Sequence, residues 1–439
     1  MLELIKKTAI DFLEKTKNRE IQVISHYDTD GITSASILTK ALKRLNKNFQ
    51  VKIVRGIDES IINELPKNKV IIFLDLASNS FHYIKNLKTE IFILDHHEII
   101  SEIPENVSIV NPHLLNEEEI SSAGITYLFA KELNEENVDL APLAIVGMVG
   151  DMLEKNIGKI YRIILKDSKI IIKKGLILYP ATRPIDKVIE YSSNIYIPNV
   201  TGSSAGANKF LRDIGIEKIN GRYKNILEVN EEELSKLLTA ITLQRINTGD
   251  QTDLIGNIYL INFFNKLEDA RELSAMINAC SRSGESGIAI SFCLQNKFAR
   301  AKVEKIYAEN KQNIVRALGS IPRLKKIENK DYLIINAEDQ IKDTIIGTIA
   351  SILSNSRQYE EGKAIIAMAY NENKIKVSAR MVGKSGKNMR EVLNSVIEII
   401  GGEVGGHKAA AGCLIEKKKE NEFIKELRKK LEVELIKIN

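Results

Sequence analysis

Acidic and imidazole side chains gather directly after apolar stretches at four places in the N-terminal part of the chain. They are His26, Asp28 and Asp30, then Asp75, then Asp95, His96 and His97, and finally Asp151. Carboxylates and imidazoles without neighbouring thiols favour Mn²⁺ or a similar divalent ion over structural zinc. Two such ions about 3.5–4 Å apart suit phosphodiester hydrolysis, because they activate water and clamp the attacking and leaving oxygens. The residue types therefore predict a two-metal phosphoesterase.

The spacing also indicates how the predicted ligands divide between two ions. Asp75 stands alone after its apolar stretch, so it is the predicted bridging ligand. The other predicted metal ligands are Asp28 for one ion, with His26 as an additional ligand, and Asp30, His96 and Asp151 for the second ion. Asp95 precedes both histidines and could orient the ring of His96 through a hydrogen bond. His97 could face the substrate as the catalytic group that polarises the phosphate or protonates the leaving oxygen.

A purely structural explanation has to be weighed against the metal site. An isolated aspartate after a strand is usually a helix cap or a turn residue. Here three of the six histidines of the chain lie in two short motifs that also contain acids. Capping explains one such motif but not all of them, which favours the metal site. Asn111 and His113, which follow another strand, could lie near the site, and a plain turn explains them equally well.

The elements that must position these groups alternate between strands and helices. Strands are expected at residues 21–25, 51–54, 70–76, 90–94 and 108–110, with helices at 32–45 and 80–87. Such alternation predicts a mostly parallel sheet with helices on both faces. Ligand sites in these sheets lie outside the carboxyl ends of the strands, so the acids and histidines should converge there.

The rest of the chain is divided more coarsely. The middle third is mixed, with helices expected at 231–246 and 267–279, and a second α/β pattern begins after residue 330. The predicted fold is α/β: an N-terminal parallel sheet flanked by helices, a mixed middle insertion and a C-terminal α/β domain. The expected boundaries are 1–190, 191–325 and 326–439.

Composition narrows the class of protein. A net charge of +5 gives no global basic field, so any nucleic-acid site must be a local groove. The three cysteines are widely spaced and fit a reducing compartment. The apolar runs stop short of the roughly 20 residues that a membrane span needs, and the N-terminus lacks the apolar core of a secretory signal. We therefore expect a cytoplasmic protein with no membrane partner.

The four acidic motifs resemble those of the DHH phosphoesterase superfamily. The name of this superfamily comes from the triplet found here as Asp95, His96 and His97. Its first motif is similar to residues 26–31, and its second and fourth motifs are matched by Asp75 and Asp151. Residues 121–124 resemble the helix start that follows the triplet in RecJ-type members. The stretch 183–202 is more similar to archaeal RecJ-type proteins than to bacterial RecJ.

The glycine-rich segment at 401–412 resembles the Gly-Gly-His signature of the companion DHHA1 domain. Gly405 and Gly406 would let backbone N–H groups approach a phosphate closely. His407 and Arg380 could add charge-assisted hydrogen bonds, so these four residues are the predicted substrate-binding group. The alternative is a glycine-rich turn before a buried, alanine-rich strand. With this resemblance, 1–190 becomes a DHH-type catalytic domain, 191–325 a connector and 326–439 a DHHA1-type substrate-binding domain.

The resemblance implies a RecJ-like exonuclease for single-stranded DNA, RNA or both, acting in DNA replication or repair with two Mn²⁺ or Mg²⁺ ions. It favours 5′-to-3′ polarity. A phosphodiesterase for oligoribonucleotides or small nucleotides stays open, although the length of chain between the two blocks favours a longer substrate. A replisome scaffold that binds GINS-like partners also stays open, and the complete set of motif acids weighs against it.

Overall fold

The computed structural model describes residues 1–115, 117–192, 195, 197–245, 254–356, 358–383 and 385–432. The chain divides into two compact units. The first unit comprises residues 1–182 and 255–308, and the second comprises residues 183–254 and 309–439. The second unit therefore includes a segment that interrupts the first unit along the chain.

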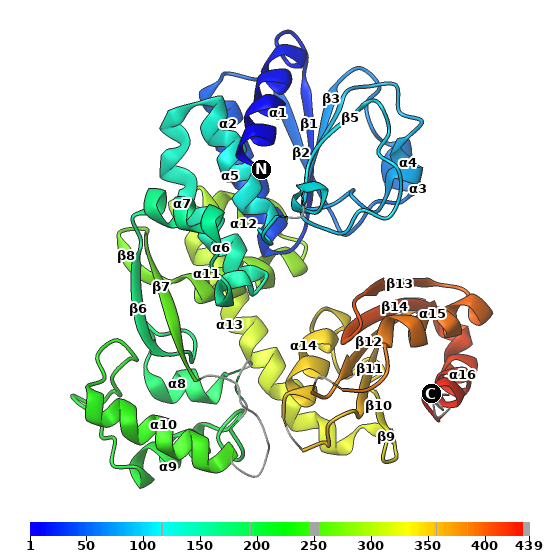
Figure 1. Ribbon diagram of the computed structural model, residues 1–439. Helices are drawn as coiled ribbons and strands as arrows, with labels where there is room; N and C mark the ends of the chain where they lie inside the picture. The colour runs from blue at the N-terminus through cyan, green and yellow to red at the C-terminus, as the bar shows by residue number, and fades with distance from the viewer. Residues whose placement is uncertain are drawn as a thin grey trace, which may run out of the picture. The chain divides into compact units, whose positions relative to one another are not determined.

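The first unit is built on a five-stranded parallel sheet, as the sequence predicts (Figure 1). The strand order is β2-β1-β3-β4-β5, and all four neighbouring pairs are parallel. The strands are β1 Ile21–His26, β2 Phe49–Val54, β3 Val70–Leu74, β4 Ile91–Leu94 and β5 Val107–Val110. Their carboxyl ends therefore meet along one edge of the sheet.

Helices cover both faces of this sheet because its inner strands are apolar on both sides. In β3, Val70, Ile72 and Leu74 point into one hydrophobic cluster, whereas Ile71 and Phe73 point into another. The helices around the sheet are α1 Leu2–Lys15, α2 Thr29–Arg44, α3 Glu59–Asn63, α4 Phe81–Ile84, α5 Ser122–Leu133, α6 Ala141–Gly150 and α7 Lys159–Ser168. The first cluster also contains the apolar faces of α1, α2, α5 and α6.

A three-stranded antiparallel sheet and three further helices complete the first unit. They are β6 Ile171–Leu176, β7 Ile255–Phe263, β8 Lys266–Asp269, α11 Ala270–Arg282, α12 Ser286–Cys293 and α13 Lys297–Ser320, of which α13 continues into the second unit. The predicted helix at 267–279 is partly wrong, because residues 266–269 form β8. Phe264 and Asn265 both have positive φ and make a two-residue hairpin turn between β7 and β8. This turn lacks the usual Asn-Gly pair, and of its two residues only Asn265 is of a type that favours positive φ.

The second unit contains a mixed six-stranded sheet in the order β13-β14-β12-β11-β10-β9. Among the described strands, β10 and β11 pair in parallel and the other neighbours are antiparallel. The strands are β9 Lys325–Glu328, β10 Tyr332–Asn336, β11 Ala364–Asn371, β12 Lys374–Met381, β13 Glu403–Gly406 and β14 Ala410–Glu416. The helices that pack on this sheet are α14 Asp343–Ser354, α15 Met389–Ile400 and α16 Glu420–Glu432.

In its described residues, the segment that interrupts the first unit contains three α-helices. They are α8 Ile185–Glu190, α9 Ser204–Asp213 and α10 Glu231–Arg245. The helix predicted at 231–246 is α10, and Ile246 lies outside the described residues. With a parallel sheet, a middle insertion and a C-terminal mixed sheet, the predicted α/β fold class is confirmed.

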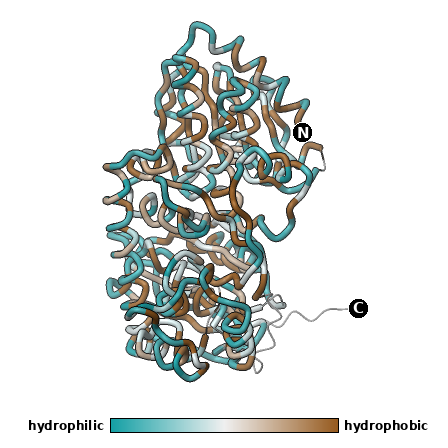
Figure 2. The backbone as a smooth tube through the Cα atoms, turned by 90° about the vertical axis from the view of Figure 1, so that its left-hand side faces the viewer, coloured by the Kyte–Doolittle hydropathy of each residue, from teal (hydrophilic) through white to brown (hydrophobic). Residues whose placement is uncertain are grey.

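Hydrophobic stretches along the backbone are short and alternate with hydrophilic ones (Figure 2). Among the described residues, no helix combines the length and the apolar character that crossing a membrane requires.

Candidate metal centre

The loop between β1 and α2 carries the first group of predicted ligands. His26 ends β1, and Asp28 caps α2 by accepting the N–H of Gly31 at 3.0 Å through Oδ1. The turn is so tight that a Cβ atom at position 31 would overlap the carbonyl of His26, which explains the glycine. The other oxygen of Asp28, Oδ2, lies 2.9 Å from Nδ1 of His26. One short loop therefore brings an imidazole and a carboxylate to the same point.

Asp30, in the first turn of α2, is fully buried, and its carboxylate lies against the N-terminus of α5. Its carboxylate oxygens accept the backbone N–H groups of Ser122 at 2.6 Å and Ala123 at 3.0 Å. A helix N-terminus favours a negative charge at this position. Gly147 of α6 makes room for the contact, because a Cβ atom there would lie 2.5 Å from Oδ1 of Asp30. Burial and the neighbouring Asp75 nevertheless raise the pKa of Asp30 to about 7.

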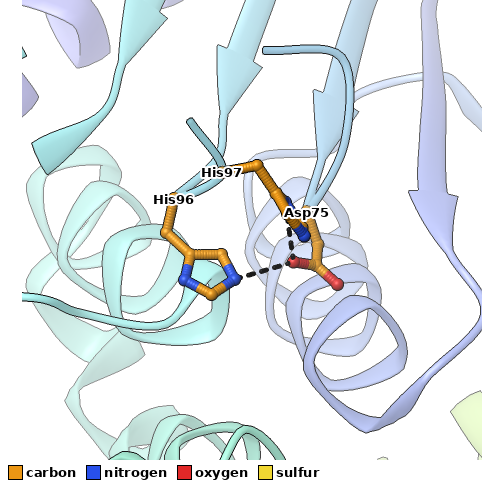
Figure 3. A group of neighbouring side chains, drawn as sticks. All are labelled: Asp75, His96 and His97. Atoms are coloured by element: carbon orange, nitrogen blue, oxygen red, sulfur yellow. Dashed lines mark ion pairs between the residues drawn. The ribbon is translucent and has the colours of Figure 1, made fainter. Parts of the chain in front are cut away.

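Asp75 occupies the centre of the cluster, directly after β3 (Figure 3). Its side chain is 2% exposed, and its oxygens lie 3.3 Å from His26 Nδ1, 3.5 Å from His96 Nε2 and 4.0 Å from His97 Nδ1. Burial alone would raise the pKa of Asp75, but the close contacts and charges of His26 and His96 outweigh it and hold this pKa well below its usual value. Asp75 is thus the group that every neighbouring imidazole approaches.

Asp151 comes from the end of helix α6 rather than from a strand. Its Oδ2 lies 3.3 Å from Nε2 of His96, which is also 4.0 Å from Asp30. Burial, together with the charges of Asp30 and Asp75, raises the pKa of Asp151 well above its usual value. Packing so many carboxylates together is unfavourable unless cations balance their charge.

Asp95 orients the ring of His97 through a side-chain contact. The sequence-based prediction that Asp95 orients the ring of His96 is therefore wrong. Oδ1 of Asp95 lies 2.7 Å from His97 Nδ1 and also accepts the backbone N–H groups of both histidines. Asn111 supports the same turn, because its amide donates to the carbonyl of His97 at 2.9 Å. Asn111 is buried beside this turn, whereas the His113 side chain is exposed and its backbone N–H donates to Asn111 Oδ1 at 2.9 Å.

Three overlapping groups of side chains have ligand atoms within 4.8 Å of one another. They are His26, Asp28 and Asp75; Asp30, Asp75, His96 and Asp151; and Asp75, His96 and His97. Within the described part of the chain, His26 Nδ1, Asp75 Oδ1 and Asp151 Oδ2 are buried without a well-formed hydrogen bond, although charged atoms lie close by. Buried polar atoms that lie close together without hydrogen bonds between them fit the ligands of a metal ion. The donor set suits two divalent ions with Asp75 between them.

Comparisons with known proteins identify the family. The chain matches the DHH family, N-terminal domain, over residues 20–148, the DHH-CID domain over 178–258 and the DHHA1 domain over 329–433. It is 32% identical over 445 residues to an uncharacterized protein of Methanocaldococcus jannaschii, covering 97% of this chain and 96% of that protein. The chain belongs to the DHH phosphoesterase superfamily.

Further relatives of this DHH phosphoesterase are more distant. The single-stranded-DNA-specific exonuclease RecJ of Bacillus subtilis is 26% identical over 165 residues, which are 34% of this chain and 21% of that protein. Two solved structures share the fold. Exonuclease RecJ bound to manganese gives a TM-score of 0.63 at 17% identity, covering 98% of this chain and 95% of that chain. CDC45 from Entamoeba histolytica gives 0.69 at 12% identity, covering 98% and 99%.

The predicted substrate-binding residues of this DHH phosphoesterase lie together in the second unit. Arg380 is on β12, where its Nε donates to Ser351 at 2.9 Å and its register partner on β14 is Ala410. Gly405 and Gly406 form the end of β13, opposite β14, and His407 is exposed in the turn between these strands. The segment is thus a β-hairpin. Its exposed tip is compatible both with phosphate binding and with a purely structural turn, the two alternatives that the sequence leaves open.

The positions of Asp75, Asp30 and His97 indicate what each of them could do in the hydrolysis of a phosphoester. Bound divalent ions would supply water activation and charge neutralisation. Asp75 is placed to join the two groups of ligands, and α5 fixes the orientation of Asp30. Burial lowers the pKa of His97, but the hydrogen bond and charge of Asp95 outweigh it and raise this pKa. Because Nδ1 contacts Asp95, the other ring nitrogen of His97, Nε2, is the one that can pass a proton to a leaving oxygen.

Proposed function

We propose that this protein is a two-metal exonuclease that hydrolyses phosphodiester bonds in single-stranded DNA or RNA with Mn²⁺ or Mg²⁺. The observation that carries the proposal is the position of Asp75, which belongs to both the His26–Asp28 group and the Asp30–His96–Asp151 group. A carboxylate shared between two ligand groups could hold two ions close together, and two-metal hydrolysis of phosphodiesters needs ions about 3.5–4 Å apart. Asp28, Asp30, Asp75, His96 and Asp151 are the proposed ligands, and His26 is an additional one.

Two features support a nucleic-acid strand as the substrate. The relative from Bacillus subtilis is named as an exonuclease for single-stranded DNA, and its likeness to this chain covers part of both proteins. The second unit adds an exposed glycine-rich hairpin next to Arg380, where backbone N–H groups and a guanidinium could bind a phosphate. We propose roles in DNA replication or repair and 5′-to-3′ polarity as the finer part of this function.

The proposal is tested by digesting single-stranded DNA and RNA that are labelled at the 5′ or the 3′ end, with Mn²⁺ present. Wild type should shorten long strands one nucleotide at a time, and Asp75→Ala should lose this activity. Asp58→Ala is a matched control, because it removes an equally charged but exposed side chain that caps α3. The label that is released first gives the polarity.

Two outcomes would replace the proposal. Fast cleavage of dinucleotides with no effect on long strands would identify a phosphodiesterase for small nucleotides. Equal cleavage by wild type and Asp75→Ala would show that the metal centre is not responsible, and a scaffold that binds GINS-like replication proteins would then be the better hypothesis.

A further inference from the structure

Helix α11 lies against the loop that carries the first predicted ligands. The contact is made by Thr29, which stands between Asp28 and Asp30 and is 1% exposed. Its backbone N–H donates to Asn278 Oδ1 at 3.1 Å, and its hydroxyl donates to the carbonyl of Ser274 at 3.0 Å. The hydroxyl of Ser274 in turn donates to the Thr29 hydroxyl at 3.2 Å. Three hydrogen bonds thus tie the first residue of α2 to α11.

The bond from Asn278 completes the N-terminal cap of α2. Thr29 and Gly31 are in the first turn of α2, where backbone N–H groups have no acceptor within the helix. Asp28 accepts the N–H of Gly31, and Asn278 accepts the N–H of Thr29. Asp28 therefore caps the helix with one oxygen and faces His26 with the other. Its orientation toward a metal ion depends on a first turn that Asn278 helps to hold.

The same helix also holds the segment that follows Asp151. At the start of α11, Arg271 forms a buried ion pair with Glu154 at 3.1 Å, three residues after Asp151. The last residue of α6, Gly150, packs against both Thr29 and Ser274, since a Cβ atom at position 150 would lie 2.9 Å from Cβ of Thr29 and 3.5 Å from Oγ of Ser274. The start of α2 therefore touches the end of α6. The start of α2 is tied to Ser274 and Asn278 in the middle of α11, and the segment after Asp151 is tied to Arg271 near the start of this helix.

We infer that α11 is a brace that fixes the separation between the Asp28–Asp30 loop and Asp151, with Asn278 as a positioning residue. A two-metal centre needs such a brace because its ligands must be held to within about 0.5 Å. Residues 270–282 lie outside residues 20–148, which match the DHH family, N-terminal domain. The inference rests on the metal centre of the proposed function, and it assigns part of the geometry of this centre to a helix that follows the inserted segment.

The test measures Mn²⁺ binding to the full chain by isothermal titration calorimetry, without substrate. Asn278→Ala should weaken binding by about 10–100-fold, as is usual when a supporting hydrogen bond behind a ligand is lost. Asn278→Asp keeps the oxygen that accepts the Thr29 N–H and should stay within a few-fold of wild type. Ser283→Ala changes an exposed hydroxyl at the end of the same helix and should bind as wild type does. Melting curves with chelator check that each variant is folded.

The possible results separate the inference from the proposed function. Absence of Mn²⁺ binding in wild type would overturn the proposed function and the inference with it. Binding by wild type and Asn278→Ala with equal affinity would overturn the inference alone. Loss of activity in both Asn278 variants with unchanged Mn²⁺ affinity would also overturn it, because Asn278 would then act on the substrate through its amide N–H. If Asn278→Ala melts too early, Ser274→Ala should show the same weakening, and wild-type affinity there would count against the brace.

Discussion

Replacing Arg271 by methionine should destabilise the first unit by about 3–5 kcal/mol, the usual loss when one partner of a buried ion pair is removed. The side chains of Arg271 and Glu154 are only 7% and 9% exposed, so water screens the abandoned carboxylate poorly. The substitution also removes the hydrogen bond to the Asn257 carbonyl at 3.1 Å and the contact with the Tyr179 ring at 4.0 Å. For a unit of this size the loss corresponds to a fall in Tm of roughly 6–20 °C.

The double variant should recover much of this loss, because the ion pair is imperfect. Arg271 Nε and Glu154 Oε2 are both buried without a hydrogen-bond partner among the described residues. Replacing such a pair by Met and Leu removes both desolvated charges and is often neutral or stabilising. Calorimetric unfolding of the full chain, with Arg271→Met and Glu154→Leu alone and combined, measures the coupling. A fall in Tm of less than about 2 °C for Arg271→Met would refute the reasoning, as would a double variant that is no more stable than the single ones.

Three further predictions concern the metal, the hairpin and pH. Mn²⁺ at about 100 times its Kd should stabilise wild type by about 2.7 kcal/mol, seen as a higher Tm, and should not stabilise Asp75→Ala. Gly406→Ala should lower the stability of the second unit by about 1–3 kcal/mol, because φ of Gly406 is +113° and a Cβ atom there would overlap the Ala410 carbonyl. Gly405→Ala is the control and should melt as wild type does, because a Cβ atom at position 405 would meet no other atom within 4 Å. Burial raises the pKa of Asp167, but the hydrogen bonds of Lys131 and Tyr127 and the charge of Lys131 outweigh it and lower this pKa. The carboxylate of Asp167 therefore stabilises the folded protein at neutral pH, and this stabilisation is lost as the pH falls below about 4. Asp167→Asn should accordingly reduce the fall in Tm that acid causes.

The convergence of the main ligands could be predicted because it follows from local features. Asp28, Asp75 and His96 each follow a short strand within two residues, and parallel strands place their carboxyl ends on one edge. The position of a ligand after a strand and the common edge of parallel strands can both be inferred without knowing any contact between distant residues. Asp151 shows the limit of this logic, since it reaches the same place from the end of helix α6. Its apolar stretch marks burial but does not distinguish a helix from a strand.

Contacts between distant parts of the chain could not be predicted in the same way. Asn278 is 249 residues away from Thr29, and no local pattern links the two positions. The choice of Asp95 between the two histidine rings depends on the conformation of a single turn, which residue spacing does not determine. The sequence therefore indicates which groups do chemistry, whereas the side chains that hold them in place depend on how α6 and α11 pack.

Asp30 and Asp151 are proposed ligands of the same ion, yet their asparagine variants should differ in stability when metal is chelated. Asp30 accepts two backbone N–H groups, from Ser122 and Ala123, so an amide NH₂ there would face a donor and leave one buried N–H unsatisfied, at about 1–3 kcal/mol. Asp151 Oδ2 has no hydrogen-bond partner within the described chain, and burial with Asp30 and Asp75 raises the pKa of Asp151 well above its usual value. Asp151→Asn therefore removes the cost of burying an ionisable carboxyl beside Asp30 and Asp75 and should raise the Tm measured in chelator, whereas Asp30→Asn should lower it. Equal melting temperatures for the two variants would mean that the start of α5 does not hold Asp30.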